Sequence, residues 1–375
     1  MFKLQKKFFL IITVILSLVL LAGCGTEKPV SETGAVTLKY AKGFKIENLA
    51  DGCKKVTDGE GRVLLLVPQG KQPPTDYKNL PLIYTPVKRV VIVSTTQAAF
   101  LRPLDELGSI IGVNSEKNLW YIDEVKAGME NGKIQMVGSG GMGPLDYDRL
   151  VALKPDIIFM STSSSKDTQT LQKLGELKIP VAVDNSWLEQ DPLGRLEWIK
   201  FIAAFYDKGQ QATSFFDNVV KKTEDISIKV AGDKVQPKVL WGLIYQGKAY
   251  VPGADSYVAK MIAMAGGDYL FKHIKGTGNV PITLEEYYAK GKEADLYFDA
   301  SMANLGHNSI AGIIAQGKVL ADLPTIKEGK VWGFQPWYWQ SLDKTDEIIG
   351  DLAAIFHPNH FSSAQLKHYL KLPKS

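Results

Sequence analysis

Short runs of consecutive apolar residues alternate with longer segments of helical period over most of the chain. The runs fall at residues 90–93, 110–113, 157–159 and 181–183 in the first half, and at 239–241, 296–298 and 331–334 in the second. A strand that is apolar at every position is buried on both faces, as in a parallel sheet covered by helices. Strands that alternate with helical segments predict βαβ units. The pattern therefore predicts an α/β protein with two lobes, each built on a parallel sheet.

The segment between the two halves predicts a buried helix. Asp191 stands before Pro192, which is typical of a helix start, because the acid caps the first turn and proline occupies its first position. Apolar side chains then occupy two stripes along residues 193–206. A helix that is apolar nearly all round is buried. We expect residues 191–208 to form a single stiff linking helix, with the C-terminal lobe at 209–375.

The residues before the first βαβ unit follow a different pattern. Strand-like runs at 37–40 and 63–67 are separated by segments rich in glycine and proline. This predicts a small β-meander over 37–86, followed by the α/β part at 87–190, so that the N-terminal lobe spans 37–190. Residues 24–36 are small and polar and are expected to form a tether.

Residues 1–23 have the pattern of an export signal peptide. Three lysines precede an apolar stretch that ends in small residues before Cys24, and it is shorter than the about 20 residues of a membrane-spanning helix. The sequence Leu21-Ala22-Gly23-Cys24 resembles the lipobox of bacterial lipoproteins, in which the cysteine is acylated. The resemblance implies lipidation of Cys24, and hence a protein held at the outer face of the cell membrane or in the periplasm. The alternative is a cysteine that happens to end an ordinary signal peptide.

Composition is that of an ordinary globular protein, with 45% hydrophobic and 22% charged residues. The net charge of +4 resides largely in the export signal, because the chain after residue 23 has 41 basic against 40 acidic side chains. This balance argues against binding to nucleic acid. With Cys24 assigned to the lipid, Cys53 has no partner for a disulfide bond.

Several short segments, in this order along the chain, resemble a known family. They are Lys88-Arg89-Val90-Val91, the heptapeptide at 150–156, Gly194-Arg195-Leu196-Glu197-Trp198, Ala265-Gly266-Gly267-Asp268, the segment from Asp322 to Val331, and Ile355-Phe356-His357-Pro358. Together they resemble the lipoprotein substrate-binding proteins of bacterial ABC importers, of the type with a rigid linking helix that binds iron-siderophores, haem or cobalamin. The resemblance implies a monomer without catalytic activity that takes a metal-organic chelate, without other cofactor, and delivers it to an ABC permease with its ATPase.

The same resemblance implies two acidic docking residues, one in each lobe. The matching positions are Asp148 and Glu285, each at the second position of a helix that Asp146 or Thr283 is expected to cap. The family carries Glu at both positions, so Asp148 is a departure with a shorter reach. The alternative is that both acids only complement the helix macrodipoles.

Ligands of two-lobed α/β proteins lie beyond the carboxyl ends of the strands, so the loops after the predicted strands are the candidate site. Many of these loops carry aromatic residues, and Trp337-Tyr338-Trp339 is the strongest local signal. The alternative places Trp337 and Trp339 in the core and Tyr338 on the surface. The candidate ligand-binding residues are Thr95, Thr96, Trp120, Tyr121, Met142, Ser163, Trp187, Tyr245, Tyr257, Asn304, Trp337, Tyr338 and Trp339.

Direct capture of a bare metal ion is not expected, because such a site needs converging histidines and carboxylates and only 5 histidines occur. Two of them, His357 and His360, lie together in the C-terminal segment, away from the candidate loops. Arginines usually hold anionic siderophores, and none of Arg62, Arg89, Arg102, Arg149 and Arg195 falls in a candidate loop. This favours a less charged chelate, such as a corrinoid or a neutral siderophore.

Two other classes of function remain open from the sequence. An extracytoplasmic lipoprotein enzyme on a similar fold finds little support, since the chain has no Gly-x-Ser-x-Gly motif and no phosphate-binding loop with a Lys-Ser/Thr pair. A surface adhesin is the third possibility, and neighbouring permease and ATPase genes would argue against it.

Overall fold

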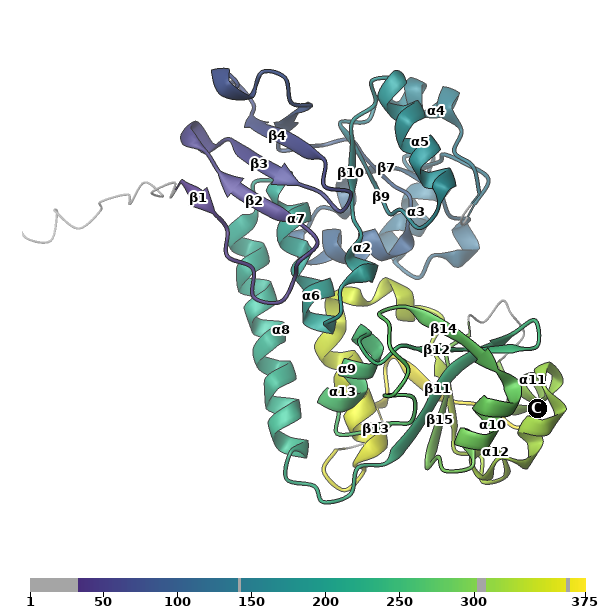
Figure 1. Cartoon of the computed structure of the whole chain (residues 1–375). Helices are drawn as coiled ribbons and strands as arrows, with labels where there is room; N and C mark the ends of the chain where they lie inside the picture. The colour runs from purple at the N-terminus through teal and green to yellow at the C-terminus, as the bar shows by residue number, and fades with distance from the viewer. Residues whose placement is uncertain (1–32, 141–142, 302–307, 362–364) are drawn as a thin grey trace, which may run out of the picture.

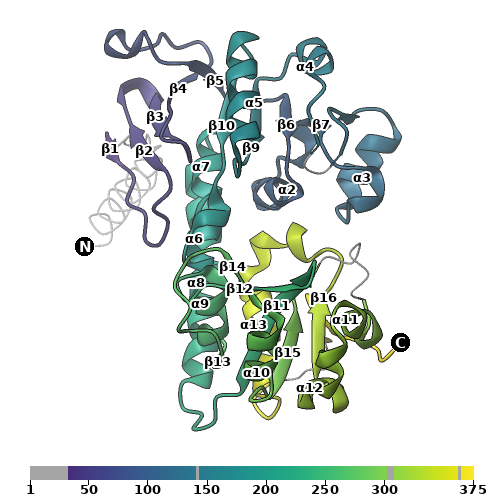
Figure 2. The same cartoon turned by 45° about the vertical axis from the view of Figure 1, so that its right-hand side comes forward.

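The computed structural model describes residues 33–140, 143–301, 308–361 and 365–375. Two lobes lie one above the other, and the long helix α8 (Gly209–Val230) runs beside both of them (Figures 1 and 2). Each lobe contains a sheet with parallel strands. The predicted fold class is therefore confirmed.

A separate sheet of five short strands opens the described chain. Its order is β1-β2-β3-β4-β5, and its strands are β1 (Gly34–Ala35), β2 (Lys45–Asn48), β3 (Lys54–Thr57), β4 (Val63–Pro68) and β5 (Leu82–Thr85). The first four strands form an antiparallel meander, as expected, but β5 pairs with β4 in parallel. β1 lies within the segment predicted as a tether, so the last residues of that segment join the sheet. One face of the sheet shares a core with α6, α7 and α8, because Ile46, Val56 and Leu64 pack in the same cluster as Trp198 and Phe216.

The N-terminal α/β unit has five parallel strands in the order β10-β9-β6-β7-β8. The strands are β6 (Val90–Ile92), β7 (Ile110–Val113), β8 (Gln135–Met136), β9 (Ile157–Met160) and β10 (Val181–Val183). The helices are α2 (Thr95–Leu101), α3 (Asp123–Glu130), α4 (Tyr147–Leu153) and α5 (Ser165–Glu176). Val90 and Ile92 pack into one core cluster, whereas Val91 packs into another with Leu150 and Leu174 from α4 and α5. The sheet is thus buried on both faces, which is why its strands are continuous apolar runs.

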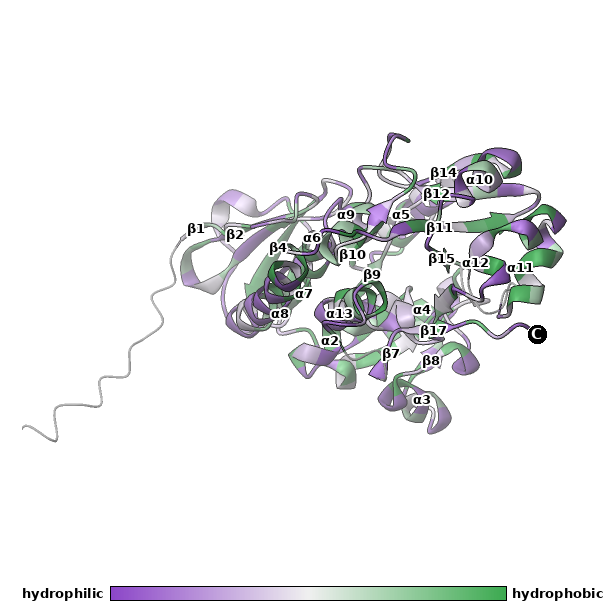
Figure 3. Cartoon of the chain, turned by 90° about the horizontal axis from the view of Figure 1, so that it is seen from below, coloured by the Kyte–Doolittle hydropathy of each residue, from purple (hydrophilic) through white to green (hydrophobic). Residues whose placement is uncertain are grey.

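The segment predicted as one linking helix forms two short helices, α6 (Pro192–Glu197) and α7 (Ile199–Ala204), which meet at Trp198. Every residue of both helices is buried, as the apolar pattern predicts. The chain then turns at 205–208 and passes from one lobe to the other along α8, so the long connector follows the predicted segment. Only one face of α8 is buried, and polar residues cover the rest of the helix (Figure 3).

The C-terminal lobe is a mixed sheet in the order β14-β12-β11-β15-β16-β17, with β13 beside β11. Its strands are β11 (Lys238–Tyr245), β12 (Lys248–Pro252), β13 (Asp268–Tyr269), β14 (Asn279–Thr283), β15 (Leu296–Asp299), β16 (Val331–Phe334) and β17 (Tyr369–Lys371). Its helices are α9 (Tyr257–Met264), α10 (Leu284–Gly291), α11 (Ile310–Gln316), α12 (Pro324–Lys327) and α13 (Thr345–Phe356). Trp241 and Phe298 stack at 5.0 Å in the core. Among the described helices, none has both the length and the apolar composition needed to cross a membrane.

Candidate functional site

Loops after the strands of both sheets meet at the boundary between the lobes. Arg102, at the end of α2, donates to both carboxylate oxygens of Asp343 at 2.5 and 2.9 Å. Gln340, in a short 3-10 helix after β16, accepts from the Tyr121 amide at 2.8 Å and donates to the Leu119 carbonyl at 2.7 Å. Burial raises the pKa of Asp343, while the Arg102 charge opposes that rise. We call these four residues with Leu119 the seam, because they hold the two lobes together at the carboxyl ends of their strands.

Two predicted rings meet at the outer edge of the seam. Tyr121 and Trp337 lie edge to face with ring centroids 6.2 Å apart, and they are 41% and 38% exposed. The Trp337 indole N–H donates to the Lys367 carbonyl at 2.9 Å, which fixes its orientation. Aromatic surface of this kind, presented by loops from both lobes, suits a flat ligand.

Three further predicted residues line a small niche behind the seam. Tyr257, Tyr338 and Trp339 lie around a cavity of about 30 Å³ together with Arg195 of α6. Tyr338 stacks on Phe334 at 4.1 Å, and burial raises the pKa of its phenol. The Arg195 guanidinium lies 4.1 Å from the centre of the Tyr257 ring. The niche therefore combines three aromatic side chains with one cation.

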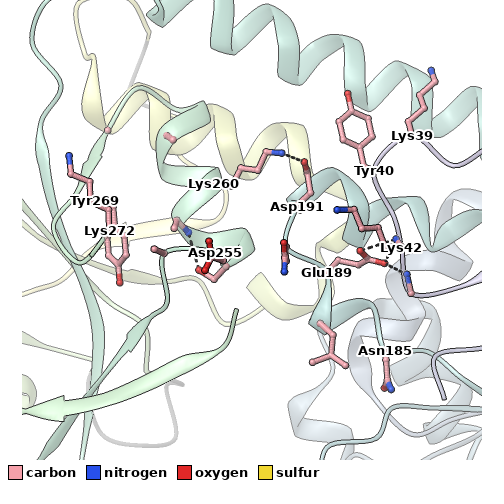
Figure 4. Close-up of a pocket in the computed structure, with 18 of the residues that line it drawn as sticks. Lys39, Tyr40, Lys42, Asn185, Glu189, Asp191, Asp255, Lys260, Tyr269 and Lys272 are labelled. Carbon is pink, nitrogen blue, oxygen red and sulfur yellow. Dashed lines mark hydrogen bonds and ion pairs between the residues drawn. The ribbon is translucent and has the colours of Figure 1, made fainter. Parts of the chain in front are cut away.

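A much larger cavity, of about 950 Å³, opens on another side of α6 (Figure 4). Its walls come from residues 39–43 and 185–191 on one side and from 254–272 on the other, so both lobes contribute. Its charged residues are largely paired, for example Lys260 with Asp191 and Lys272 with Asp268. Glu189, on the wall, accepts from the backbone amides of Lys42 and Gly43. Of the eleven predicted ligand-binding residues that the structure describes, none lines this cavity.

The other predicted residues are not brought together. Trp120 is 1% exposed, and its indole N–H bonds to the Ser115 carbonyl, so its ring belongs to the N-terminal core because the loop folds inward. Thr95 and Thr96 begin α2, and Ser163 bonds to Asp167. Trp187 and Tyr245 are 40% and 44% exposed. Met142, Asn304 and the proposed lipid site Cys24 lie outside the described residues.

The arrangement of the Trp337-Tyr338-Trp339 rings differs from both expectations. Tyr338 is the buried member, at 6% exposure, because it fits between Phe334 and Tyr369. Trp337 faces solvent and Trp339 is half-buried against Tyr338. One tyrosine therefore enters the core and leaves the two tryptophans near the boundary.

Both predicted docking acids occupy the second position of a capped helix. The Asp146 carboxylate accepts from the Arg149 amide at the start of α4, and the Thr283 hydroxyl accepts from the Glu286 amide at the start of α10. Asp148 and Glu285 are both exposed. The local geometry that the sequence predicts for them is present in both lobes.

In the described part of the chain, no group of three or more His, Cys, Asp or Glu side chains is arranged so that it could hold a metal ion. His357 and His360 both bond to Asp233, at 2.6 and 2.8 Å, and His357 also bonds to the Gly266 carbonyl. These contacts join the end of α13 to the loop after α8.

Arg195 is the residue of the niche that the sequence analysis missed. None of the five arginines was expected in a candidate loop, but Arg195 lines the niche from α6 and Arg102 takes part in the seam from the end of α2. A signal for Arg195 was present in the sequence, because a helix that is apolar all round must bury any arginine it carries.

Residues 90–336, more than half of the chain, match the family model described as "Periplasmic binding protein". The chain belongs to the periplasmic binding protein family. The matched range begins at β6 and ends just after β16, so it covers the N-terminal parallel sheet, the C-terminal mixed sheet except β17, and α8, whereas β1–β5 precede it. The family is one of substrate-binding proteins, so this periplasmic binding protein is not an enzyme.

Two uncharacterized lipoproteins of Methanocaldococcus jannaschii are similar to the chain in sequence. One is 34% identical over 92% of this chain and 88% of its own length, and the other is 28% identical over 98% of this chain and 100% of its own length. Because the second similarity spans nearly the whole chain, it includes the five-stranded N-terminal sheet.

Several solved structures share the fold. A periplasmic heme-binding protein of Pseudomonas aeruginosa has a TM-score of 0.57 at 18% identity, covering 75% of this chain and 95% of its own. The Helicobacter pylori protein CeuE, in a Ni-His complex, has a TM-score of 0.58 at 17% identity, covering 83% of this chain and 90% of its own. At such identities the likeness extends to the fold alone.

Proposed function

We propose that this periplasmic binding protein is a lipid-anchored receptor of an ABC importer. It captures a metal-organic chelate, a ferric siderophore, a corrinoid or haem, between its two lobes and delivers it to the permease. The observation that carries the proposal is the family match from β6 to β16, which includes α8 and most of the sheet of each lobe. In such a fold, ligands bind beyond the carboxyl ends of the strands.

The aromatic side chains at the lobe boundary support a wide, partly apolar chelate as the ligand. Tyr121 and Trp337 present ring surface from opposite lobes, and Trp339 lines the niche nearby. Flat rings cover a wide apolar or conjugated ligand at a low cost in side-chain entropy. The names of similar structures, one a heme-binding protein and one a possible iron-binding protein, agree with this class of ligand.

Tryptophan fluorescence tests the proposed ligand and its place. Titration with haem, cyanocobalamin and ferric siderophores is expected to quench the fluorescence for at least one of them. Replacing Trp337 and Trp339 by alanine is expected to weaken that ligand by about 1 kcal/mol or more per lost ring contact. Tyr84→Ala, which removes a ring 48% exposed on β5, is the control and should leave the affinity unchanged. Unchanged affinity in a folded double variant would instead favour the large cavity beside Lys260.

The lipid anchor on Cys24 has a test of its own. The names of the two relatives as lipoproteins support it, as does the sequence before the cysteine. Cys24→Ser is expected to abolish incorporation of labelled fatty acid and to leave unprocessed precursor, whereas Cys53→Ser serves as the control and should change neither. Fatty-acid labelling of the Cys24 variant would contradict the anchor.

A further inference from the structure

Arg195 is a buried cation that forms no close ion pair. One acidic group acts on it from longer range, the buried Asp184 carboxyl, where burial raises the pKa and the Arg195 charge opposes that rise. Its side chain is 8% exposed, and its Nε has no hydrogen-bond acceptor. Within the described residues, no carboxylate oxygen lies within ion-pair distance of its guanidinium, although many other basic side chains have such a partner. The guanidinium carbon instead lies over the face of the Tyr257 ring, 4.1 Å from its centroid.

Burial of an unpaired charge is unfavourable, so buried charges in folded proteins are normally paired. The neighbouring turn of the same helical segment obeys this rule, since the buried Lys200 ammonium lies 2.7 Å from Glu197. Cation–π contact with Tyr257 recovers only part of the lost hydration. Packing alone therefore does not explain why Arg195 is buried without a close ion pair.

The surroundings of Arg195 fit one small group. The cavity beside it measures about 30 Å³, and its other walls include Pro192, Met261 and Ile348, which are apolar. That volume exceeds the roughly 10–15 Å³ needed for one water and is far too small for a macrocycle. Because one face of the guanidinium lies on Tyr257, its remaining donors point along the guanidinium plane, where a planar carboxylate binds in a bidentate way.

We propose that Arg195 is the anion-receiving residue of the binding site and that it pairs with a carboxylate or a similar small planar anion. The inference rests on the proposed function and narrows it, since the chelate would carry such a group at its edge. A free small anion that binds together with the chelate would use the same chemistry. In both cases the anion supplies the acceptor that Arg195 lacks in the protein alone.

Formate, a small planar anion that fits the niche, tests this inference without any chelate. Thermal unfolding of the full chain is measured in sodium formate and in a matched concentration of a sodium sulfonate buffer that is too bulky for the niche. Formate is expected to raise the Tm of the wild type by about 2 °C or more and to leave Arg195→Met unchanged. Arg195→Lys keeps the charge but loses the bidentate geometry, so we expect an intermediate shift. Equal shifts in the wild type and Arg195→Met, or no shift in the wild type, would overturn the inference.

Haem, which carries propionates, distinguishes the two sources of the anion. If formate weakens the quenching of tryptophan fluorescence by haem, the carboxylate belongs to the ligand. If formate strengthens it, the anion is free and binds beside the ligand. Haem affinity that is the same with and without formate, and in Arg195→Met, would remove Arg195 from the site. Failure of haem to bind would count against haem as the ligand in the proposed function, while the formate measurement still decides the role of Arg195.

Discussion

Two buried charged residues of α6 differ in their hydrogen bonds: one is fully hydrogen-bonded within the protein, and the other is not. On the side that faces residues 39–41, the Glu197 carboxylate is fully buried and accepts from three backbone amides at 2.8 to 3.0 Å and from Lys200 at 2.7 Å. On the side that faces α9, Arg195 is also buried but has no acceptor for its Nε in the described chain. The two residues are neighbours in sequence, so the difference arises from what packs against each side.

The contrast separates a structural charge from a functional one. Burial alone would raise the pKa of Glu197, but the hydrogen bonds from Ala41, Lys200, Lys39 and Tyr40 hold it below its usual value. Its interactions are complete within the protein. Arg195 offers hydrogen bonds that the protein leaves unused, which is what a binding site requires before its ligand arrives.

Glu197→Gln is expected to cause the largest loss of stability. Both carboxylate oxygens accept hydrogen bonds, so an amide would turn its own N–H groups toward donors and leave Lys200 without a counter-ion. We expect the free energy of unfolding in urea to fall by about 3 kcal/mol or more. Asp217→Asn, which breaks the exposed ion pair with Lys39, is the control and should cost about 0.5 kcal/mol or less. Equal losses of unfolding free energy in Glu197→Gln and Asp217→Asn would contradict the interpretation that the buried Glu197 carboxylate is a structural charge.

The pH dependence of the Glu197 effect is the second prediction. Because the folded-state pKa of Glu197 is lowered, its stabilisation is present above the unfolded-state pKa of about 4.3 and is lost as pH falls through the folded value. The difference in unfolding free energy between the wild type and Glu197→Gln should therefore shrink below about pH 4.

Asp184 provides a control of opposite sign for that measurement. Burial raises the pKa of this carboxyl, so the folded state holds its proton more tightly than the unfolded state. The stability of the wild type relative to Asp184→Asn should rise as pH falls toward the acid range. The same direction of change for both variants would contradict the assignment of the two environments.

Burial decides which parts of the fold and of the candidate site could be predicted from the sequence. Strands inside the N-terminal sheet, such as β7 and β9, appear as continuous apolar runs because helices cover both faces. Edge strands such as β14, whose residues alternate between exposed and half-buried, leave no such run. The state of Arg195 depends on α9 and on residues 338–339, which are more than 60 residues away in the chain, so periodicity cannot reveal that its charge is unpaired.

Glu189→Gln is expected to cause a smaller loss of stability than Glu197→Gln. Glu189 also holds the 39–43 segment, and its Oε1 receives the amides of Lys42 and Gly43 and the Trp198 indole, each at 2.9 Å. Its Oε2 receives only a second, longer contact from the Lys42 amide, at 3.1 Å. A glutamine keeps that oxygen, so we expect a loss of only about 1 kcal/mol in the urea unfolding free energy. A loss as large as that of Glu197→Gln would mean that the charge itself, rather than the number of occupied oxygens, dominates.

The smallest effect on stability is expected for Asp148 and Glu285, whose charges are exposed and need no partner in the protein. If they dock onto permease arginines, as proposed, reversal to lysine at both positions should abolish uptake of the chelate, because like charges would face each other at the contact. The unfolding free energy should change by about 0.5 kcal/mol or less, and calorimetric ligand affinity should stay unchanged. Glu124→Lys is the matched control, since Glu124 is exposed at the second position of α3 and loses the same macrodipole interaction. If uptake survives the double reversal, or falls equally with Glu124→Lys, then Asp148 and Glu285 do not dock onto the permease and only complement the helix macrodipoles. In that case an exposed, unpaired charge in this fold would not indicate a functional residue. The buried charge of Arg195 would remain the better indication of a binding site.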